Sequence, residues 1–150
     1  MASFPAGVVV VTANGADGRP RGLTVSAFCP VSLDPPLLLV CIDRSSNTLP
    51  AIQSSGGFTV NILATGRQEL ARHMATKHDE KFDSVTWAAA GVPEGGPVLV
   101  DDVAAHAVCT VERAVEAGDH WVFFGRVMAG GAVEGQIPLV YHRRAFFELG

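Results

Sequence analysis

Hydroxyl-bearing residues alternate with apolar ones at the start of the stretch GLTVSAFCPVSLDPP, residues 22–36. Thr24, Ser26 and Ser32 stand an even number of residues apart, where a core-facing strand would carry valine or leucine. A hydroxyl both donates and accepts hydrogen bonds, so such a strand can bind the polar edge of a ligand while Val25 faces the core. The alternative is that these hydroxyls face water on a half-exposed antiparallel sheet. Ser32 follows Pro30 and is expected in a loop, where its hydroxyl could equally stabilise a turn.

A second polar cluster occurs where a helix is expected to begin, in DRSSNTLPAI, residues 43–52. Backbone N–H groups at a helix N-terminus, together with hydroxyls and one cation, form a binding site for an anion such as a phosphate. The residues that would supply these groups are Arg44, Ser45, Ser46, Asn47 and Thr48. Simple helix capping, with Asn47 as the N-cap, would use one or two of the same side chains.

Two further blocks carry residues that suit cofactor chemistry. HDEKFDSVTW sets Lys81 beside Phe82, although a solvated lysine next to a buried phenylalanine has the same pattern. AGDHWVFFGRV places His120 directly after a turn, at the start of a strand; an exposed turn histidine is the alternative. His73 and His78 share no metal-ligand spacing with cysteine or acidic residues, so no metal site is expected.

Most of the chain has the residue pattern of β-strands. Strands are expected at 8–14, 23–28, 37–43 and 58–63, and the pattern returns from residue 98 onward, with turns in EAGD, AGGAVEGQ and HRRA. Short helices are expected at 47–56 and 66–76. Antiparallel strands at this spacing predict a mostly β fold, a barrel with helical insertions.

Composition narrows the class of protein. The 150 residues, 48% hydrophobic and 17% charged, are sufficient for one domain with its own core, so a single domain over 1–150 is expected. A net charge of −4 without a basic cluster argues against nucleic-acid binding. No apolar run approaches the roughly eighteen residues of a membrane span. Cys29, Cys41 and Cys109 lack CxxC spacing and are typical of reduced thiols, so the protein is expected in the cytoplasm.

Six blocks of this sequence, taken in order, resemble the flavin reductase-like domain family, which includes the reductase components of two-component flavin monooxygenases. They are FPAGVVVVTA, GLTVSAFCPVSLDPPLLLVCID, GGFTVNIL, EKFDSVTW, AGDHWVFFGRV and PLVYHRRAFFEL. The resemblance covers nearly the whole chain and implies a split β-barrel, usually dimeric, that binds FMN or FAD and oxidises NADH or NADPH. Members usually carry a helix before the first block. Only Met1 to Ser3 precede it here, so either the chain is trimmed or the contacts of that helix are missing.

The resemblance also implies roles for individual residues. Backbone N–H groups near Ala27 and Phe28, with Thr24 and Ser26, would hydrogen-bond the isoalloxazine ring of the flavin. The full set of cofactor-binding residues expected is Thr24, Val25, Ser26, Ala27, Ser32, Cys41, Asp43, Arg44, Ser45, Ser46, Thr48, Lys81, Phe82 and Tyr141.

Two of these roles concern phosphate and nicotinamide. In related proteins the loop that matches Ser46 and Thr48 binds the flavin phosphate, and Arg143 and Arg144 would also reach cofactor phosphates. The histidine that matches His120 lies near the nicotinamide, so His120 is expected to be the catalytic residue, acting first by positioning that ring.

Together these features predict an NAD(P)H-dependent flavin reductase that transfers hydride to FMN or FAD and supplies reduced flavin to a partner monooxygenase. A homodimer is expected from the resemblance. Two alternatives stay open: a flavoprotein that retains FMN and reduces another acceptor, and a non-catalytic flavin-binding protein. No GxGxxG motif follows a strand, so the sequence does not choose between NADH and NADPH.

Overall fold

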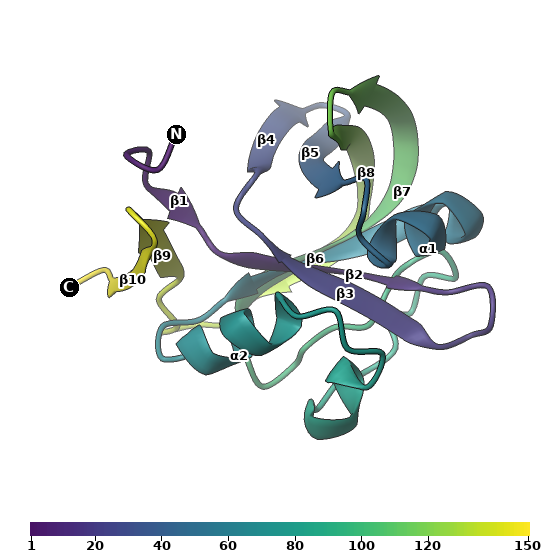
Figure 1. Ribbon diagram of the computed structural model, residues 1–150. Coiled ribbons are helices and arrows are strands. Elements are labelled where there is room, and N and C mark those ends of the chain that lie inside the picture. Colours follow the sequence, from purple (N-terminus) through teal and green to yellow (C-terminus); the bar gives the residue numbers. More distant parts are fainter.

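The computed structural model describes all residues, 1–150, and consists mainly of antiparallel strands (Figure 1). The strands are β1 (Ala6–Gly7), β2 (Val9–Asn14), β3 (Pro20–Val25), β4 (Phe28–Leu33), β5 (Pro36–Asp43), β6 (Gly57–Leu63), β7 (Val103–Ala117), β8 (His120–Ala132), β9 (Leu139–His142) and β10 (Ala145–Glu148). The helices are α1 (Thr48–Ser55), α2 (Gln68–Met74) and the short 3-10 helix η1 (Lys81–Ser84). The expectation of a mostly β fold with short helices is confirmed. None of the helices is long and apolar enough to cross a membrane.

Seven strands form one curled sheet in the order β3-β2-β6-β7-β8-β5-β4, with antiparallel neighbours throughout. β3 and β4 lie at opposite ends of this order, yet only Ser26 and Ala27 connect them. The two edges must therefore lie close together, as in a barrel that is split rather than closed. The N–H of Cys41 donates a hydrogen bond to the carbonyl of Ala27 over 3.0 Å, which holds this crossing against β5.

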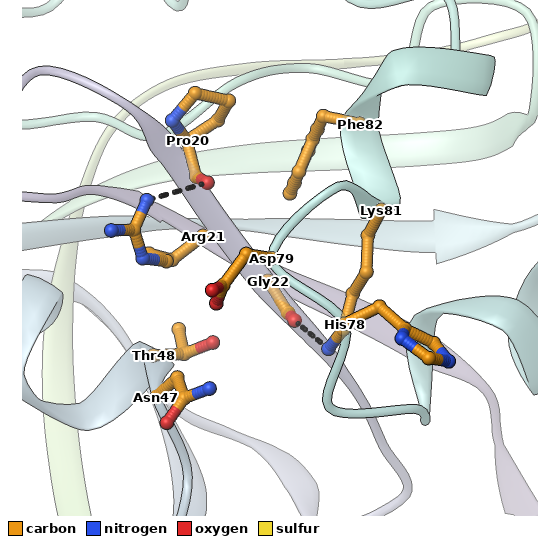
Figure 2. Close-up of a pocket in the computed structure, with 9 residues that line it drawn as sticks. All are labelled: Pro20, Arg21, Gly22, Asn47, Thr48, His78, Asp79, Lys81 and Phe82. Carbon is orange, nitrogen blue, oxygen red and sulfur yellow. Dashed lines mark hydrogen bonds between the residues drawn. The ribbon is translucent and has the colours of Figure 1, made fainter.

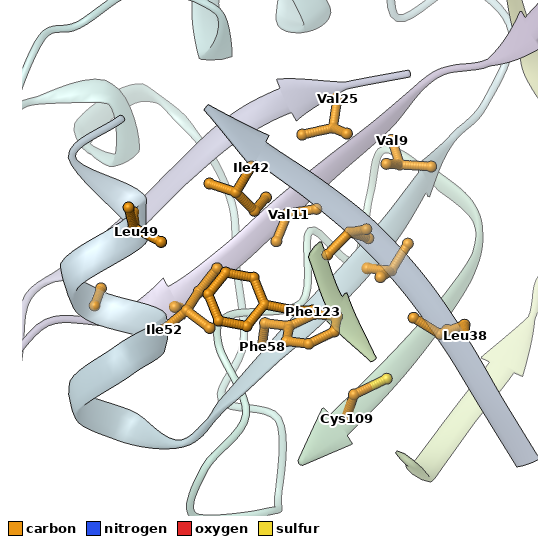
Figure 3. Packing of buried hydrophobic residues seen from close by; sticks show 14 residues of the cluster. Val9, Val11, Val25, Leu38, Ile42, Leu49, Ile52, Phe58, Cys109 and Phe123 are labelled. Atoms are coloured by element: carbon orange, nitrogen blue, oxygen red, sulfur yellow. The ribbon is translucent and has the colours of Figure 1, made fainter. Parts of the chain in front are cut away.

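The apolar run Val8–Val11 has both of its faces buried, which explains why no polar residue interrupts it. Val9 and Val11 belong to a cluster of 14 buried residues that includes Ile52 of α1 (Figure 3). Val8 and Val10 belong to a second cluster of 9 buried residues that includes Met74 of α2. Successive side chains of a strand point to opposite faces, so this single segment joins the two cores.

A second, three-stranded sheet in the order β1-β9-β10 brings the two ends of the chain together (Figure 1). The guanidinium carbon of Arg72 in α2 lies 5.1 Å from the centre of the Phe146 ring in β10. This contact, together with the packing of Phe146 on the second buried cluster, sets the small sheet beside α2.

A buried polar cluster holds the irregular segment 95–99 against the large sheet. Asn61 in β6 is fully buried; its Nδ2 donates to the carbonyl of Val10 over 3.2 Å, and its Oδ1 accepts from the N–H of Leu99 over 2.9 Å. Thr12 and Thr59 donate to the carbonyls of Pro97 and Gly96 over 2.6 and 2.7 Å. Buried polar groups are retained when each finds a partner, as these do.

Three local expectations differ from the structure. Ser32 lies in strand β4 rather than in a loop after Pro30; β4 is an edge strand, where a proline costs no ladder hydrogen bond. The strand expected from residue 98 begins at Val103, because 98–102 is held by the buried polar cluster and a turn. Asn47 precedes α1 but makes no side-chain capping bond, and the hydroxyl of Ser46 accepts from the N–H of Thr48 instead, over 3.1 Å.

Candidate active site

Two neighbouring hollows lie along the end of β3, and Ala75 lines both of them. We refer to the two together as the cleft. The first, the polar hollow, has a volume of about 180 Å³ and is lined chiefly by Asp43, Ser45, Ser46, Lys77 and Lys81. The second, the apolar chamber, has a volume of about 390 Å³ and is lined chiefly by Thr24, Val25, Ser26, Tyr141, Arg144 and Phe146. Leu23 lines the polar hollow and the next three residues line the apolar chamber, so β3 passes from one to the other.

The hydroxyls of the polar hollow are ordered by Asp43. One carboxylate oxygen of Asp43 accepts from the N–H of Ser45 over 2.8 Å and from its Oγ over 2.7 Å. These two hydrogen bonds, the side-chain bond first, lower the pKa of Asp43. Lys77 Nζ donates to Ser45 Oγ over 3.3 Å from the opposite wall. Hydroxyls and a cation therefore converge just before the N-terminus of α1, which suits an anion.

The cation that contacts the hydroxyls of this hollow is Lys77 rather than Arg44. Arg44 forms an ion pair with Glu116 of β7, while its N–H donates to the carbonyl of Asp119 over 3.0 Å. Thr48 is buried and lines a neighbouring hollow with Arg21, Asn47 and Asp79, shown in Figure 2. That hollow has a volume of about 20 Å³, enough for about one water molecule.

Lys81 forms the base of the cleft. Its Nζ donates to the carbonyl oxygens of Gly22 and Met74 over 2.8 and 2.9 Å, and the first of these bonds is drawn in Figure 2. Partial burial lowers the pKa of this ammonium group. Phe82 is buried in the cluster under α2, and a Cβ at Gly22 would approach its ring to 3.0 Å. Lys81 thus ties β3 to the end of α2 while also facing the polar hollow.

The crossing between β3 and β4 offers unused hydrogen-bond donors. The backbone N–H groups of Ser26 and Ala27 donate to no acceptor within the chain, and both residues are exposed. Thr24 Oγ1 donates to the carbonyl of Ala71 over 2.5 Å, and Val25 is buried in the main core. Two free N–H groups beside an apolar wall match the polar edge and flat face of a conjugated ring.

The apolar chamber gains its far wall from the small sheet. The rings of Tyr141 and Phe146 lie 5.2 Å apart between centres, and Arg72 lies over Phe146. Val8 and Ala71 complete the apolar lining. Sequence patterns did not point to Lys77, Arg72 or Phe146, because each enters the cleft through the packing of α2 and the segment after it.

Seven of the expected site residues line neither part of the cleft: Ala27, Ser32, Cys41, Arg44, Thr48, Phe82 and His120. Ser32 lies on the edge strand β4, and Cys41 lies on β5, where burial raises the pKa of its thiol. His120 begins β8 directly opposite Asp43 of β5, and its Nδ1 lies 2.7 Å from a carboxylate oxygen of Asp119. Thr48 and Phe82 line the neighbouring hollow instead, and the guanidinium of Arg44 is paired with Glu116. The expected residues that do line the cleft are Thr24, Val25, Ser26, Asp43, Ser45, Ser46, Lys81 and Tyr141.

The model of the flavin reductase-like domain matches residues 1–150 of this chain. The chain is 47% identical over 147 residues to a flavin reductase (NADH) of Kitasatospora aureofaciens, covering 97% of this chain and 76% of the relative. It is 35% identical over 143 residues to the reductase subunit of a flavin-dependent monooxygenase of Rhodococcus jostii. That alignment covers 95% of this chain and 71% of the relative. Its fold is similar to that of the NADH:FAD oxidoreductase of Streptomyces globisporus C-1027, with a TM-score of 0.92 and 30% sequence identity. The superposition covers 99% of this chain and 89% of that structure.

Proposed function

Since the chain belongs to the flavin reductase-like domain family, we propose that it is an NAD(P)H-dependent flavin reductase acting on FMN or FAD. A reduced nicotinamide supplies a hydride from its C4 carbon, and the flavin accepts it at N5 when the two rings are stacked. The protein's contribution is to hold both rings in place and to keep their phosphates bound. The observation that carries this proposal is the placement of free N–H groups and an apolar wall directly beside a polar hollow that contains a lysine and hydroxyl groups.

The ring of the flavin fits the crossing between β3 and β4. The free N–H groups of Ser26 and Ala27 would donate to its carbonyl and nitrogen edge, and Thr24 and Val25 would lie along it. Ala75, which lines both parts of the cleft, marks where the ring would continue toward the phosphate.

The phosphate of the flavin fits the polar hollow. Ser46 and Lys77 would supply a hydroxyl and an ammonium donor, and the N-terminus of α1 would add a favourable dipole. The Ser45 hydroxyl donates to Asp43 and accepts from Lys77, so its role would be to hold Lys77 beside the phosphate. Lys81, bonded to two carbonyls, would act mainly by holding the walls of the cleft together.

His120 keeps its proposed role of positioning the nicotinamide, and we propose that the protein is a homodimer in which His120 of one copy acts at the cleft of the other. His120 lies outside the cleft of its own chain, beyond Asp43 and Ser45. Val31 and Leu33 on the edge strand β4 are 45% and 97% exposed. Exposed apolar residues on an edge strand favour association with another surface, and a second copy of this chain would cover them.

Reduced flavin would leave the open cleft to serve a monooxygenase, and the protein would work in the cytoplasm, where its three unpaired cysteines stay reduced. Anaerobic mixing of the protein with NADH or NADPH and with riboflavin, FMN or FAD tests the activity. Loss of nicotinamide absorbance is expected with FMN or FAD. No oxidation with any pair would reject a flavin reductase, and co-elution of flavin on gel filtration would identify a protein that retains its cofactor.

A further inference from the structure

The turn between β9 and β10 has an unusual backbone for its residues. Arg143 and Arg144 have φ angles of 49° and 63°, in the left-handed region, and they are the only non-glycine residues of the chain with positive φ. Two-residue hairpin turns of this shape favour Asn-Gly, because a Cβ atom crowds the backbone at positive φ and glycine has none. Residues held in an unfavourable backbone conformation, as at these two successive positions, are commonly found in functional segments.

Only one of these two arginines faces the cleft. Arg144 lines the apolar chamber together with Tyr141 and Phe146, whereas Arg143 lines neither part of the cleft, so the expectation that Arg143 also reaches a cofactor phosphate is not supported. The guanidinium of Arg72, which also lines the chamber, is paired with Glu69 and lies over Phe146. Arg144 takes part in none of the ion pairs of the chain. The chamber therefore combines apolar and aromatic walls with one cation that has no anionic partner.

We infer that the apolar chamber binds the pyridine nucleotide and that Arg144 binds one of its phosphates, an assignment that rests on the proposed function. With the flavin phosphate in the polar hollow and its ring near Ser26, the side of the chamber formed by Tyr141 and Phe146 is left for a second flat ring. That ring belongs to a molecule that carries phosphates, and the planar fork of an arginine matches a phosphate in geometry and charge.

The turn itself supplies a matched pair of variants. Arg144→Gly and Arg143→Gly each remove one positive charge and place glycine, which accepts positive φ without strain, in the same turn. The flavin-saturated variants are mixed anaerobically with NADH and with NADPH at several concentrations. Titration with oxidised NAD⁺ and NADP⁺ measures binding without turnover, and circular dichroism with thermal melting shows that both variants fold.

Arg144→Gly is expected to weaken binding of the pyridine nucleotide by about 5- to 50-fold, with the flavin dissociation constant and the limiting reduction rate nearly unchanged. Arg143→Gly is expected to match the wild type. A loss of affinity for both NADH and NADPH would show that Arg144 binds the pyrophosphate. A loss of affinity for NADPH alone would show that it binds the 2′-phosphate.

Equal nucleotide binding in the two variants would overturn the inference, as would a loss of flavin binding in Arg144→Gly. Failure of the proposed function is a separate outcome, because the wild-type protein itself would then reduce no flavin.

Discussion

Lys77 Nζ lies 3.3 Å from Ser45 Oγ, so a residue just after α2 reaches across the polar hollow to the loop before α1. The two residues are 32 positions apart in the sequence. This contact places a cation beside the hydroxyls of Ser45 and Ser46. Arg44, the cation nearest to these residues in the sequence, is instead paired with Glu116.

Lys77→Ala should weaken binding of FMN by about 5- to 30-fold while leaving riboflavin binding nearly unchanged, because only FMN carries a phosphate. Flavin fluorescence titration measures both affinities. Arg113→Ala is the control, since Arg113 is an exposed cation on β7 that does not line the cleft. An equal loss of affinity for FMN and riboflavin would remove Lys77 from the phosphate site.

Ser46→Ala should reduce the preference for FMN over riboflavin, because Ser46 lines the polar hollow. The same change leaves the N–H of Thr48 without its hydroxyl partner, so the free energy of unfolding should fall by about 1 kcal/mol. Urea denaturation measures the second effect separately from the first. A destabilised variant with an unchanged FMN-to-riboflavin ratio would show that Ser46 only caps the helix.

His120→Ala should lower kcat/KM for NAD(P)H by roughly 5- to 150-fold and leave flavin affinity nearly intact, if the imidazole positions the nicotinamide. Anaerobic stopped-flow reduction of the flavin-saturated enzyme separates the two effects, and circular dichroism confirms folding. His106→Ala, on β7, is the comparison variant. Wild-type kinetics would reject the role of His120, while weaker flavin binding with unchanged reduction would assign it to the flavin.

Stability should decline in alkali because of Cys109. Burial raises the pKa of its thiol from 9.0 to about 12. The unfolded chain therefore loses this proton at lower pH than the folded protein, so the stabilisation present below pH 9 is lost as pH rises toward 12. Urea unfolding at several pH values should show a shallower alkaline decline in Cys109→Ala. The lowered pKa of Lys81 makes stability change with pH in the opposite direction, but this contribution is the same in the wild type and in Cys109→Ala. An equal decline of the free energy of unfolding with pH in the two proteins would contradict the prediction.

Asn61→Leu should destabilise the protein by about 1–3 kcal/mol, because the buried N–H of Leu99 loses its hydrogen-bond acceptor, whereas the carbonyl of Pro97 keeps its bond from Thr12. Thr65→Val is a matched contrast. The hydroxyl of Thr65 is buried without a hydrogen-bond partner, so its removal should cost little. Thermal melting of both variants provides the test, and a similar melting temperature for the two would argue against a structural role of the Asn61 cluster.

Local patterns predicted the elements of this protein well. The β-branched run at Val8–Val11 predicted a strand, and the turns around Gly118 and Arg143 stand where expected. These features depend on steric preferences and side-chain alternation that act over a few residues, so they can be read from the chain directly. Ser32 and the start of β7 were misplaced because their neighbours in space, rather than in sequence, decide where those strands run.

The amino-acid sequence alone is sufficient to identify the family resemblance, the mostly β fold and the two polar stretches at residues 24–27 and 43–48. How these stretches come together at the cleft depends on the packing of elements that are distant in the sequence. Lys77, Arg72 and Arg144 reach that cleft because α2 and the β9–β10 hairpin pack beside the end of β3. A polar side chain becomes part of a site through distances set by the packing of distant elements, and residue type and spacing do not encode those distances.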